Sequence, residues 1–435
     1  MEKVFRLKEH GTTFHREIIA GFTTFLTMAY ILAVNPGILG TIGGGMTPGA
    51  VFTATVVSSA IATLIMAFAA NLPIALAPGM GVNAFFTYTV VSFMGYSWQI
   101  ALTAVFLEGV VFVILSFFKI REAIVNAIPA NLKKAVAVGI GLFITLIGFA
   151  NGGIVMGHYS EGMVLALGDV TIGHPLVALL GFIIIIVLYT FKVPGSILIG
   201  ILLTTLIGIP FGITQIPAGW SPIGSPAAPL LFAFDFNPSV LISFKFFTVL
   251  CTFLFVDIYD TVGTLIGVTH QAGLLDREGN IPRVKQALLA DAVGTVAGAA
   301  LGTSTVTSYG ESVAGVAAGG RTGLTSLVTG LLFLAALFLS PIFLLVPVAA
   351  TAPALIMVGY LMIKPVVTIN FEDPTEGIPA FLAIIMMPFA YSIAEGIVFG
   401  VISYVILKLA ANKFREISVV TWILFVIFML RFFMK

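Results

Sequence analysis

The chain has 435 residues, of which 59% are hydrophobic and 9% are charged, and its formal net charge is +1. Soluble domains carry about 25% charged residues, so this composition excludes a water-soluble globular protein and any basic patch for nucleic acid. Between Glu17 and Lys119 the only charged residue is Glu108. So long a segment with one charge is typical of several helices surrounded by lipid, which predicts a multi-pass membrane protein.

Apolar stretches near the length that a helix needs to cross the hydrocarbon core recur along the whole chain. They predict an all-α protein with about 14 transmembrane spans after an N-terminal segment at 1–17. The predicted spans are 18–40, 50–70, 72–94, 98–118, 132–150, 173–191, 195–212, 243–268, 286–301, 303–320, 322–345, 347–364, 378–391 and 392–411. A further apolar stretch, 417–433, lies in the C-terminal segment 412–435. This stretch is either a helix on the membrane surface or an extra transmembrane span, unless the region 378–411 is divided into spans wrongly. Arg431 and Lys435 favour a stretch that does not cross the membrane.

Lys and Arg residues predict which side of the membrane each loop faces. They precede the first span and then occupy alternate loops, whereas the opposite loops 151–174 and 211–244 contain none. Cytoplasmic loops are enriched in these residues, so the N-terminus and the loops 119–131 and 269–285 are expected in the cytoplasm, in a plasma membrane. The residues that follow this rule are Lys3, Arg6, Lys8, Arg16, Lys119, Arg121, Lys133, Lys134, Lys192, Arg277, Arg283, Lys285, Arg321 and Lys364; Lys245 is the exception.

A long, proline-rich external linker at 213–242 separates two halves that share weak sequence similarity. Thr24-Phe25-Leu26 opens the first half (18–212) and Thr252-Phe253-Leu254 opens the second (243–411). Seven spans per half would make the second half enter the membrane from the opposite side, which predicts two inverted repeats.

The third span of each half begins with a sequence that is unsuited to a helix. Residues 72–81 contain two prolines and two glycines, and residues 302–311 are rich in Thr, Ser and Val. We expect an extended segment that reaches the middle of the membrane, followed by a half-helix with free N-terminal amides. Two such breaks would form a binding site for a small polar molecule; the alternative is a glycine-rich surface for helix packing.

Six acidic residues lie within predicted spans, where a carboxylate must be protonated, hydrated or bound to a ligand. Glu311, at the break of the tenth span, is the strongest candidate for a binding site. Asp257 and Asp260 share a face of the eighth span, and Asn83 follows the break in the third span, where it either binds a ligand or satisfies local backbone groups. The other three carboxyl groups, flanked by Gly or Ala, are interpreted as structural: Glu108, Asp291 and Glu395.

Four motifs, TTFLTMAYILAVNPGIL, LAPGMGVNAFF, FVDIYDTVGTL and TSYGESVAGVAAGGRTGLTS, resemble the xanthine/uracil permease superfamily, in its AzgA-like branch of adenine, guanine and hypoxanthine permeases. The resemblance implies a core domain of spans 1–4 and 8–11, a gate domain of spans 5–7 and 12–14, and short strands that open spans 3 and 10. It also implies that Asp260 and Glu311 bind the nucleobase, with the backbone of Tyr309 and Gly310 against the base. Because burial raises the pKa of a carboxyl group toward physiological values, the same two residues are candidates for holding the coupling ion. Asp257 matches a branch position too, and which aspartate contacts substrate is left open.

The resulting functional hypothesis is a purine importer that works by alternating access and proton or sodium symport, with no cofactor beyond the coupling ion. One alternative is an anion transporter of the sulfate-permease type, and another is a pyrimidine or xanthine permease. An enzyme is not expected, because the spans contain no nucleophile beside a base and no metal cluster, and Cys251 is the single cysteine. Whether two copies associate as a homodimer is left open.

Overall fold

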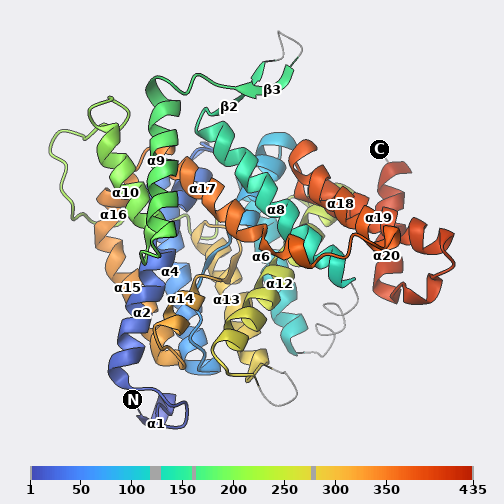
Figure 1. The fold of residues 1–435 in the computed structure, drawn as a ribbon, viewed down its shortest axis with the longest axis horizontal. Coiled ribbons are helices and arrows are strands. Elements are labelled where there is room, and N and C mark those ends of the chain that lie inside the picture. Colours follow the sequence, from blue (N-terminus) through green and yellow to red (C-terminus); the bar gives the residue numbers. More distant parts are fainter. Residues whose placement is uncertain (1, 118–128, 159–162, 276–280, 434–435) are drawn as a thin grey trace.

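The computed structural model describes residues 2–117, 129–158, 163–275 and 281–433, and these residues are mostly helical (Figure 1). Lys119, Arg121 and Arg277, which contributed to the predicted orientation, lie outside the described residues. Among the described residues, ten helices are long and apolar enough to cross a membrane. Four shorter apolar helices accompany them: Met80–Phe93, Ser196–Gly208, Pro374–Phe389 and Val419–Met429. The chain is therefore a multi-pass membrane protein.

The first half contains the elements up to residue 208. They are α1 (Glu2–Phe5), α2 (Phe14–Met28), α3 (Ile31–Leu39), α4 (Pro48–Ile65), η1 (Met66–Ala70), β1 (Leu76–Pro78), α5 (Met80–Ala84), η2 (Phe85–Phe93), α6 (Trp98–Phe117), α8 (Ala130–Asn151), β2 (Val155–His158), β3 (Met163–Leu167), α9 (Gly173–Thr190) and α10 (Ser196–Gly208).

The second half follows the linker. Its elements are α11 (Pro238–Leu241), α12 (Phe244–Gln271), α13 (Val284–Leu301), β4 (Val306–Ser308), α14 (Ser312–Ala317), α15 (Gly323–Ala336), η4 (Leu337–Leu339), α16 (Ser340–Leu344), α17 (Val348–Met362), η5 (Lys364–Thr368), α18 (Pro374–Phe389), α19 (Ile393–Ala410), η6 (Phe414–Glu416) and α20 (Val419–Phe433).

Each predicted span overlaps one or more of these elements: the first, for example, contains α2 and α3, and the tenth contains β4 and the six-residue helix α14. The structure also contains a pair of strands that was not predicted. The loop predicted at 151–174 contains the antiparallel hairpin of β2 and β3, which Figure 1 shows at the end of the molecule opposite α1. The stretch at 417–433 forms α20, which packs against α19.

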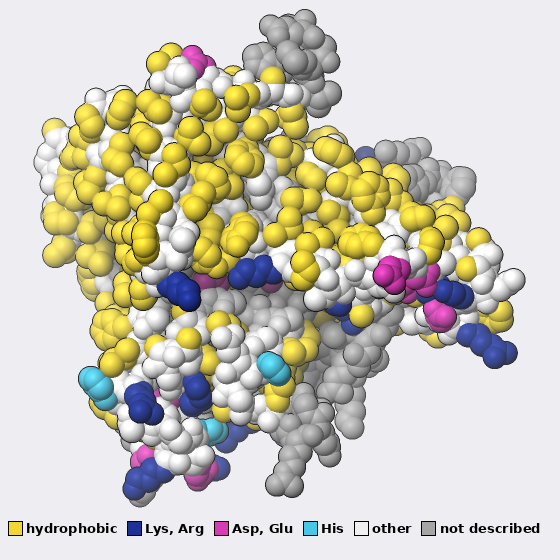
Figure 2. All heavy atoms as spheres, viewed as in Figure 1, with side chains coloured by type: hydrophobic (Ala, Val, Ile, Leu, Met, Phe, Trp, Pro, Cys, Tyr) yellow, Lys and Arg dark blue, Asp and Glu magenta, His cyan; other side chains and the backbone are white. Residues whose placement is uncertain are grey.

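The helices pack most extensively within two groups. One group contains α2, α4, α6, α12, α13 and α15, and the other contains α8, α9, α10, α17, α18 and α19. Glycines permit close approach within each group: a Cβ on Gly109 of α6 would lie 2.9 Å from Val296 of α13, and one on Gly139 of α8 would lie 2.6 Å from Met387 of α18. Figure 2 shows hydrophobic side chains covering the face over α8, α9 and α17, whereas Lys, Arg and His side chains gather toward α1.

The predicted strands at the two breaks are present and pair with each other. β1 and β4 form an antiparallel pair with Leu76 opposite Ser308 and Pro78 opposite Val306. Two further backbone bonds extend the pair, from the amide of Tyr309 to the carbonyl of Ala75 (2.9 Å) and from the amide at residue 79 to the carbonyl at residue 305 (3.0 Å). Non-helical backbone within a membrane requires such partners, because lipid offers none. The two repeats are therefore joined through their broken spans.

Two threonines at matching positions of the repeats bind the outer edges of these strands. The Thr63 hydroxyl of α4 accepts from the Leu76 amide (2.9 Å) and donates to the Leu76 carbonyl (3.1 Å). The Thr295 hydroxyl of α13 does the same for Val306, at 3.2 and 3.0 Å. All four residues are buried. One hydroxyl per strand therefore satisfies a donor and an acceptor that a sheet would normally pair with a third strand.

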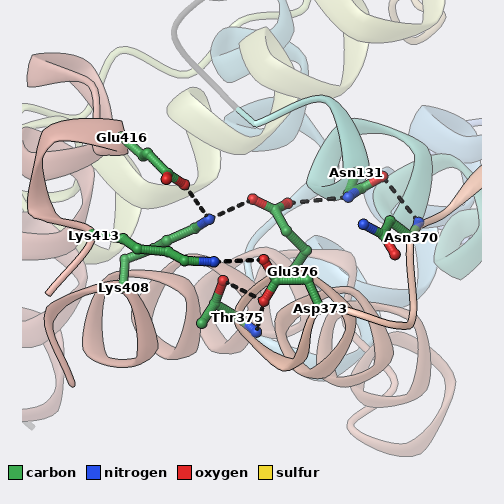
Figure 3. Close-up of polar contacts among 8 residues, drawn as sticks. All are labelled: Asn131, Asn370, Asp373, Thr375, Glu376, Lys408, Lys413 and Glu416. Atoms are coloured by element: carbon green, nitrogen blue, oxygen red, sulfur yellow. Dashed lines mark hydrogen bonds and ion pairs between the residues drawn. The ribbon is translucent and has the colours of Figure 1, made fainter. Parts of the chain in front are cut away.

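A buried lysine that the span predictions overlooked organises the end of α19. Lys408, within the predicted span 392–411, is 1% exposed, and its ammonium group lies 2.8 Å from Glu376 of α18 and 2.6 Å from Glu416 of η6 (Figure 3). Lys413 lies 2.7 Å from Asp373. Its hydrogen bond, with those from Thr375, holds the pKa of Asp373 below its usual range. These ion pairs attach the chain that leads to α20 to α18 and α19.

We expect Thr63→Val and Thr295→Val each to lower thermal stability, because each leaves a buried amide and a buried carbonyl without their partner. Such a loss costs about 1–3 kcal/mol per group. Unfolding of the detergent-purified protein, followed by intrinsic fluorescence, measures the effect. Thr63→Ser and Thr295→Ser keep the hydroxyl and should resemble the parent.

Thr204→Val is the matched control, since the buried Thr204 hydroxyl donates to the carbonyl of Gly200 in its own helix. The interpretation of the strand edges is wrong if the Thr63 and Thr295 valine variants unfold at the same temperature as Thr204→Val.

Candidate functional site

A cavity of about 1170 Å³ lies between the two packing groups, beside the paired breaks. One wall is built by α2, α12, β4, α14 and residues 79–81 of the first break, and the other by the ends of α9 and α17 and the start of α10. Figure 2 shows this face of the molecule hollowed between the two groups, with Lys or Arg side chains at the rim of the hollow. The residues of the second wall include Tyr189, Lys192, Ser196, Tyr360 and Lys364.

Four of the six predicted site residues line this cavity together: Asp260, Tyr309, Gly310 and Glu311. Asp260 comes from the middle of α12, and its Oδ2 atom accepts a hydrogen bond from the Thr307 hydroxyl at 3.4 Å. Glu311 immediately precedes α14, and its Oε1 atom accepts a hydrogen bond from the Tyr30 hydroxyl at 2.5 Å. Two carboxyl groups from different elements of the second repeat therefore face one cavity.

The other two predicted residues, Asn83 and Asp257, are not among the described residues that line the cavity. Asn83 is fully buried in α5, where its side-chain oxygen accepts a hydrogen bond from the Ser304 hydroxyl. Asp257 is also fully buried, one turn before Asp260 in α12. Positions three apart on a helix differ by about 60° in direction, and here the cavity contacts only the second aspartate.

Tyr309 connects the two breaks through its side chain as well as its backbone. The phenol hydroxyl donates to the carbonyl of Pro78 at 2.6 Å, and the ring is 5% exposed. The segments around Pro78 and Tyr309, which open the third span of each repeat, are therefore in direct contact.

The glycines at the breaks have different roles. A Cβ added to Gly310 would meet no atom within 4 Å, so the backbone there is open to the cavity. By contrast, a Cβ on Gly79 would lie 2.9 Å from Thr307, and one on Gly81 would lie 2.7 Å from Ile140. The first break is thus partly the packing surface that the sequence also allowed, whereas Gly310 can admit a ligand against the backbone.

The expectation of free amides at the start of α14 is corrected by the structure. The amides of residues 312–314 donate to the carbonyls of residues 309–311 at 3.2, 3.0 and 2.9 Å. A tight turn with bonds between residues three apart satisfies these donors without a ligand. At the start of α14 the Glu311 carboxyl group therefore lines the cavity. The first amides of the helix already have partners and are not available to a ligand.

The carboxyl groups interpreted as structural lie outside the described lining of the cavity. Asp291 accepts hydrogen bonds from Thr261 (2.7 Å) and Ser308 (3.5 Å), and Glu108 accepts one from Thr305 (3.4 Å). The segment 303–308 thus contacts several helices of the same packing group, one side chain after another. The complete set of these side-chain pairs is Thr303 with Asn35, Ser304 with Asn83, Thr305 with Glu108, Thr307 with Asp260 and Ser308 with Asp291.

Sequence analysis missed two buried polar residues, of which Tyr30 lines the cavity. Tyr30 interrupts the first span between α2 and α3, and it stood within the motif TTFLTMAYILAVNPGIL without being singled out. Glu17 is fully buried at the start of α2 and accepts hydrogen bonds from the amides of Arg321 and Thr325. Neither pairing has a local signal, because each joins residues about 300 positions apart along the chain.

The comparisons with known proteins agree with this architecture. A family model described as a permease family matches residues 15–399. The chain is 42% identical to the adenine permease AdeP of Escherichia coli, over 99% of this chain and 95% of the relative. It is 45% identical to the guanine/hypoxanthine permease PbuG of Bacillus subtilis, over 99% of each chain.

Among solved structures, the transmembrane domain of the cyanobacterial bicarbonate transporter BicA has the same fold, with a TM-score of 0.65 at 17% identity, over 88% of this chain and 97% of that one. The overall structure of SLC26A9 is similar with a TM-score of 0.62 at 11% identity, over 91% of this chain and 65% of that one. Because the family model covers most of the chain and these relatives match it almost from end to end, the chain is a member of the permease family.

Proposed function

We propose that this chain imports purine nucleobases across the plasma membrane by symport with a cation, through alternating access to one central site. Its family makes it a multi-pass transporter and not an enzyme. The names of its relatives, which are adenine and guanine/hypoxanthine permeases, support the purine class. The observation that carries the proposal is the placement of Asp260 and Glu311 on the wall of one cavity.

Carboxylates suit purine bases because adenine, guanine and hypoxanthine present N–H donors along their edges. A carboxylate accepts several hydrogen bonds, and bonds to an ionised group are roughly twice as strong as neutral ones. Gly310 allows the base to lie against backbone. In this proposal Asp260 and Glu311 hold the base from two directions, with the backbone of Tyr309 and Gly310 beneath it.

The same two carboxyl groups are the proposed sites of ion coupling. Each carboxyl group can carry a proton at one stage of the cycle and accept a base N–H at another. Sodium is the second candidate, because backbone carbonyls at broken spans of transporters bind it. The described residues contain no group of three or more His, Cys, Asp or Glu arranged for a metal ion, so a sodium site would rely on such carbonyls.

The two packing groups are the proposed core and gate domains, and their relative movement would expose the site to each side in turn. The core would comprise spans 1–4 and 8–11, with Asp260 and Glu311, and the gate spans 5–7 and 12–14. Lys192 and Lys364 line the cavity from the gate and belong to loops with a cytoplasmic charge pattern. These two lysines support a cavity that opens to the cytoplasm, on the same side as the N-terminus.

An anion transporter is the alternative that shares this fold, as the bicarbonate transporter shows. Similarity at 17% identity establishes the fold alone. An anion would be expected to meet amide donors or cations at its binding site. Lys192 and Lys364 line the opposite wall, but beside the breaks the first amides of α14 are engaged and two carboxyl groups stand next to them, which favours a ligand that donates hydrogen bonds to this wall.

Uptake of radiolabelled bases into cells that express the protein tests the function. We expect adenine, guanine or hypoxanthine to accumulate, and the accumulation to collapse either with a protonophore or on sodium removal. Uracil, xanthine and sulfate are the comparison substrates. Efficient uptake of one of these three, without competition from any of the three purines, would contradict the proposal.

We expect Glu311→Gln and Asp260→Asn to weaken purine binding, because each adds N–H donors where the base also donates. A mismatch of buried polar groups costs about 1–3 kcal/mol, which corresponds to roughly tenfold or greater loss of affinity. Calorimetry on purified protein separates binding from transport. Glu395→Gln, at a carboxyl group outside the described lining of the cavity, is the matched control and should have little effect; parent-like binding by Glu311→Gln would show that the site is wrong.

The orientation is tested by cysteine labelling in intact cells, in a background with Cys251→Ala. Lys285→Cys lies at an exposed position in the first turn of α13, next to a loop with cytoplasmic charges, and Ser225→Cys lies at an exposed position of the linker. A membrane-impermeant maleimide should label Ser225→Cys and spare Lys285→Cys until the cells are opened. The reverse pattern would invert the topology.

A further inference from the structure

Tyr30 stands where the first span of one repeat meets the carboxyl group of the other. It lies between the end of α2 at Met28 and the start of α3 at Ile31. The side chain is 1% exposed and lines the cavity, and its hydroxyl lies 2.5 Å from Glu311 Oε1. A tyrosine hydroxyl carries one proton, and this geometry directs that proton to the carboxylate. The same hydroxyl therefore cannot at the same time donate to a ligand.

The elements that carry these two groups are packed tightly against each other. The Thr27 hydroxyl, one turn before Tyr30, lies 3.4 Å from the Glu311 carbonyl, and its closer acceptor is the Thr24 carbonyl of its own helix at 2.9 Å. Gly315 of α14 lies against Thr24 of α2 so closely that an added Cβ would overlap the threonine hydroxyl. Both ends of the Tyr30–Glu311 bond are thus held by packed backbone. The bond therefore fixes the direction of the Glu311 carboxyl group, because the backbone that carries each of the two side chains is closely packed.

We propose that Tyr30 is a positioning residue of the nucleobase site, which engages one oxygen of Glu311 so that the other faces the base. This inference rests on the proposed function, and it gives Tyr30 a role that the resemblance to the permease family does not imply. A carboxylate that is already held in one rotamer loses less conformational freedom when the base binds, so affinity rises without an additional contact to the base. Tyr30 therefore acts through Glu311.

A double-mutant cycle separates this role from direct contact with the base and from a purely structural role. The variants are Tyr30→Phe, Glu311→Gln and the two combined, and the readout is equilibrium binding of tritiated adenine, guanine or hypoxanthine to purified full-length protein. We expect Tyr30→Phe to weaken binding about 5- to 10-fold in the parent. In the Glu311→Gln background the same change should alter binding less than about twofold.

Tyr88→Phe is the matched control for removal of a partly buried phenol hydroxyl. The Tyr88 hydroxyl accepts a hydrogen bond from Asn151 at 2.9 Å, and Tyr88 lies outside the described lining of the cavity. It should leave affinity unchanged in both backgrounds. If Tyr30→Phe is unstable, Glu311→Asp provides a second test, because it withdraws the carboxylate from the phenol while keeping its charge; it should weaken binding to a similar extent.

Two results would overturn the role of Tyr30 while leaving the transport function intact. One is parent-like affinity in Tyr30→Phe, and the other is an equal fold-loss in both backgrounds, which would indicate direct contact with the base. If the parent binds none of the three purines, the proposed function fails first, and the role of Tyr30 fails with it.

Discussion

Backbone amides and carbonyls that leave a helix inside a membrane must find partners within the protein, and this requirement shapes the centre of the molecule. The two breaks provide partners for each other through β1 and β4. Thr63 and Thr295 satisfy the outer edges of the two strands. The strand register then determines where Tyr309, Gly310 and Glu311 emerge, since they follow β4 directly. The position of the cavity wall is therefore a consequence of how the backbone is satisfied.

The inverted repeats are matched in backbone but not in chemistry. At the first break, Gly79 and Gly81 line the cavity but are closely packed against Thr307 and Ile140, and Asn83 is bound to the second repeat through Ser304. At the second break, Glu311 faces the cavity, joined there by Asp260. One repeat thus supplies support and the other supplies carboxyl groups. An asymmetric ligand such as a purine suits a site to which the two symmetry-related repeats contribute different chemical groups.

Local composition was enough to locate the breaks and Glu311, because Pro, Gly, Ser and Thr interrupt apolar spans and charges within spans are rare. The resemblance to the permease family implied short strands at those breaks, and the structure contains them, paired with each other. The partners of each group were not predictable in this way. Tyr30 and Glu311 lie 281 positions apart, and the separation of Asp257 from Asp260 depends on the rotation of α12 about its own axis. The β2–β3 hairpin was also missed, because two short strands in a loop between predicted spans give little periodic signal.

The pairing of β1 with β4 also constrains the biosynthesis of the protein. Tyr309 and Pro78, which form a hydrogen bond across the junction, are 231 positions apart. At 5–20 residues per second, translation takes roughly 10–50 s to bring the second segment to the first. During that time the first break has none of its partners from β4, so it must remain shielded by protein or water. The first repeat alone cannot complete its own core, and the binding site comes into existence only after the tenth span has been inserted.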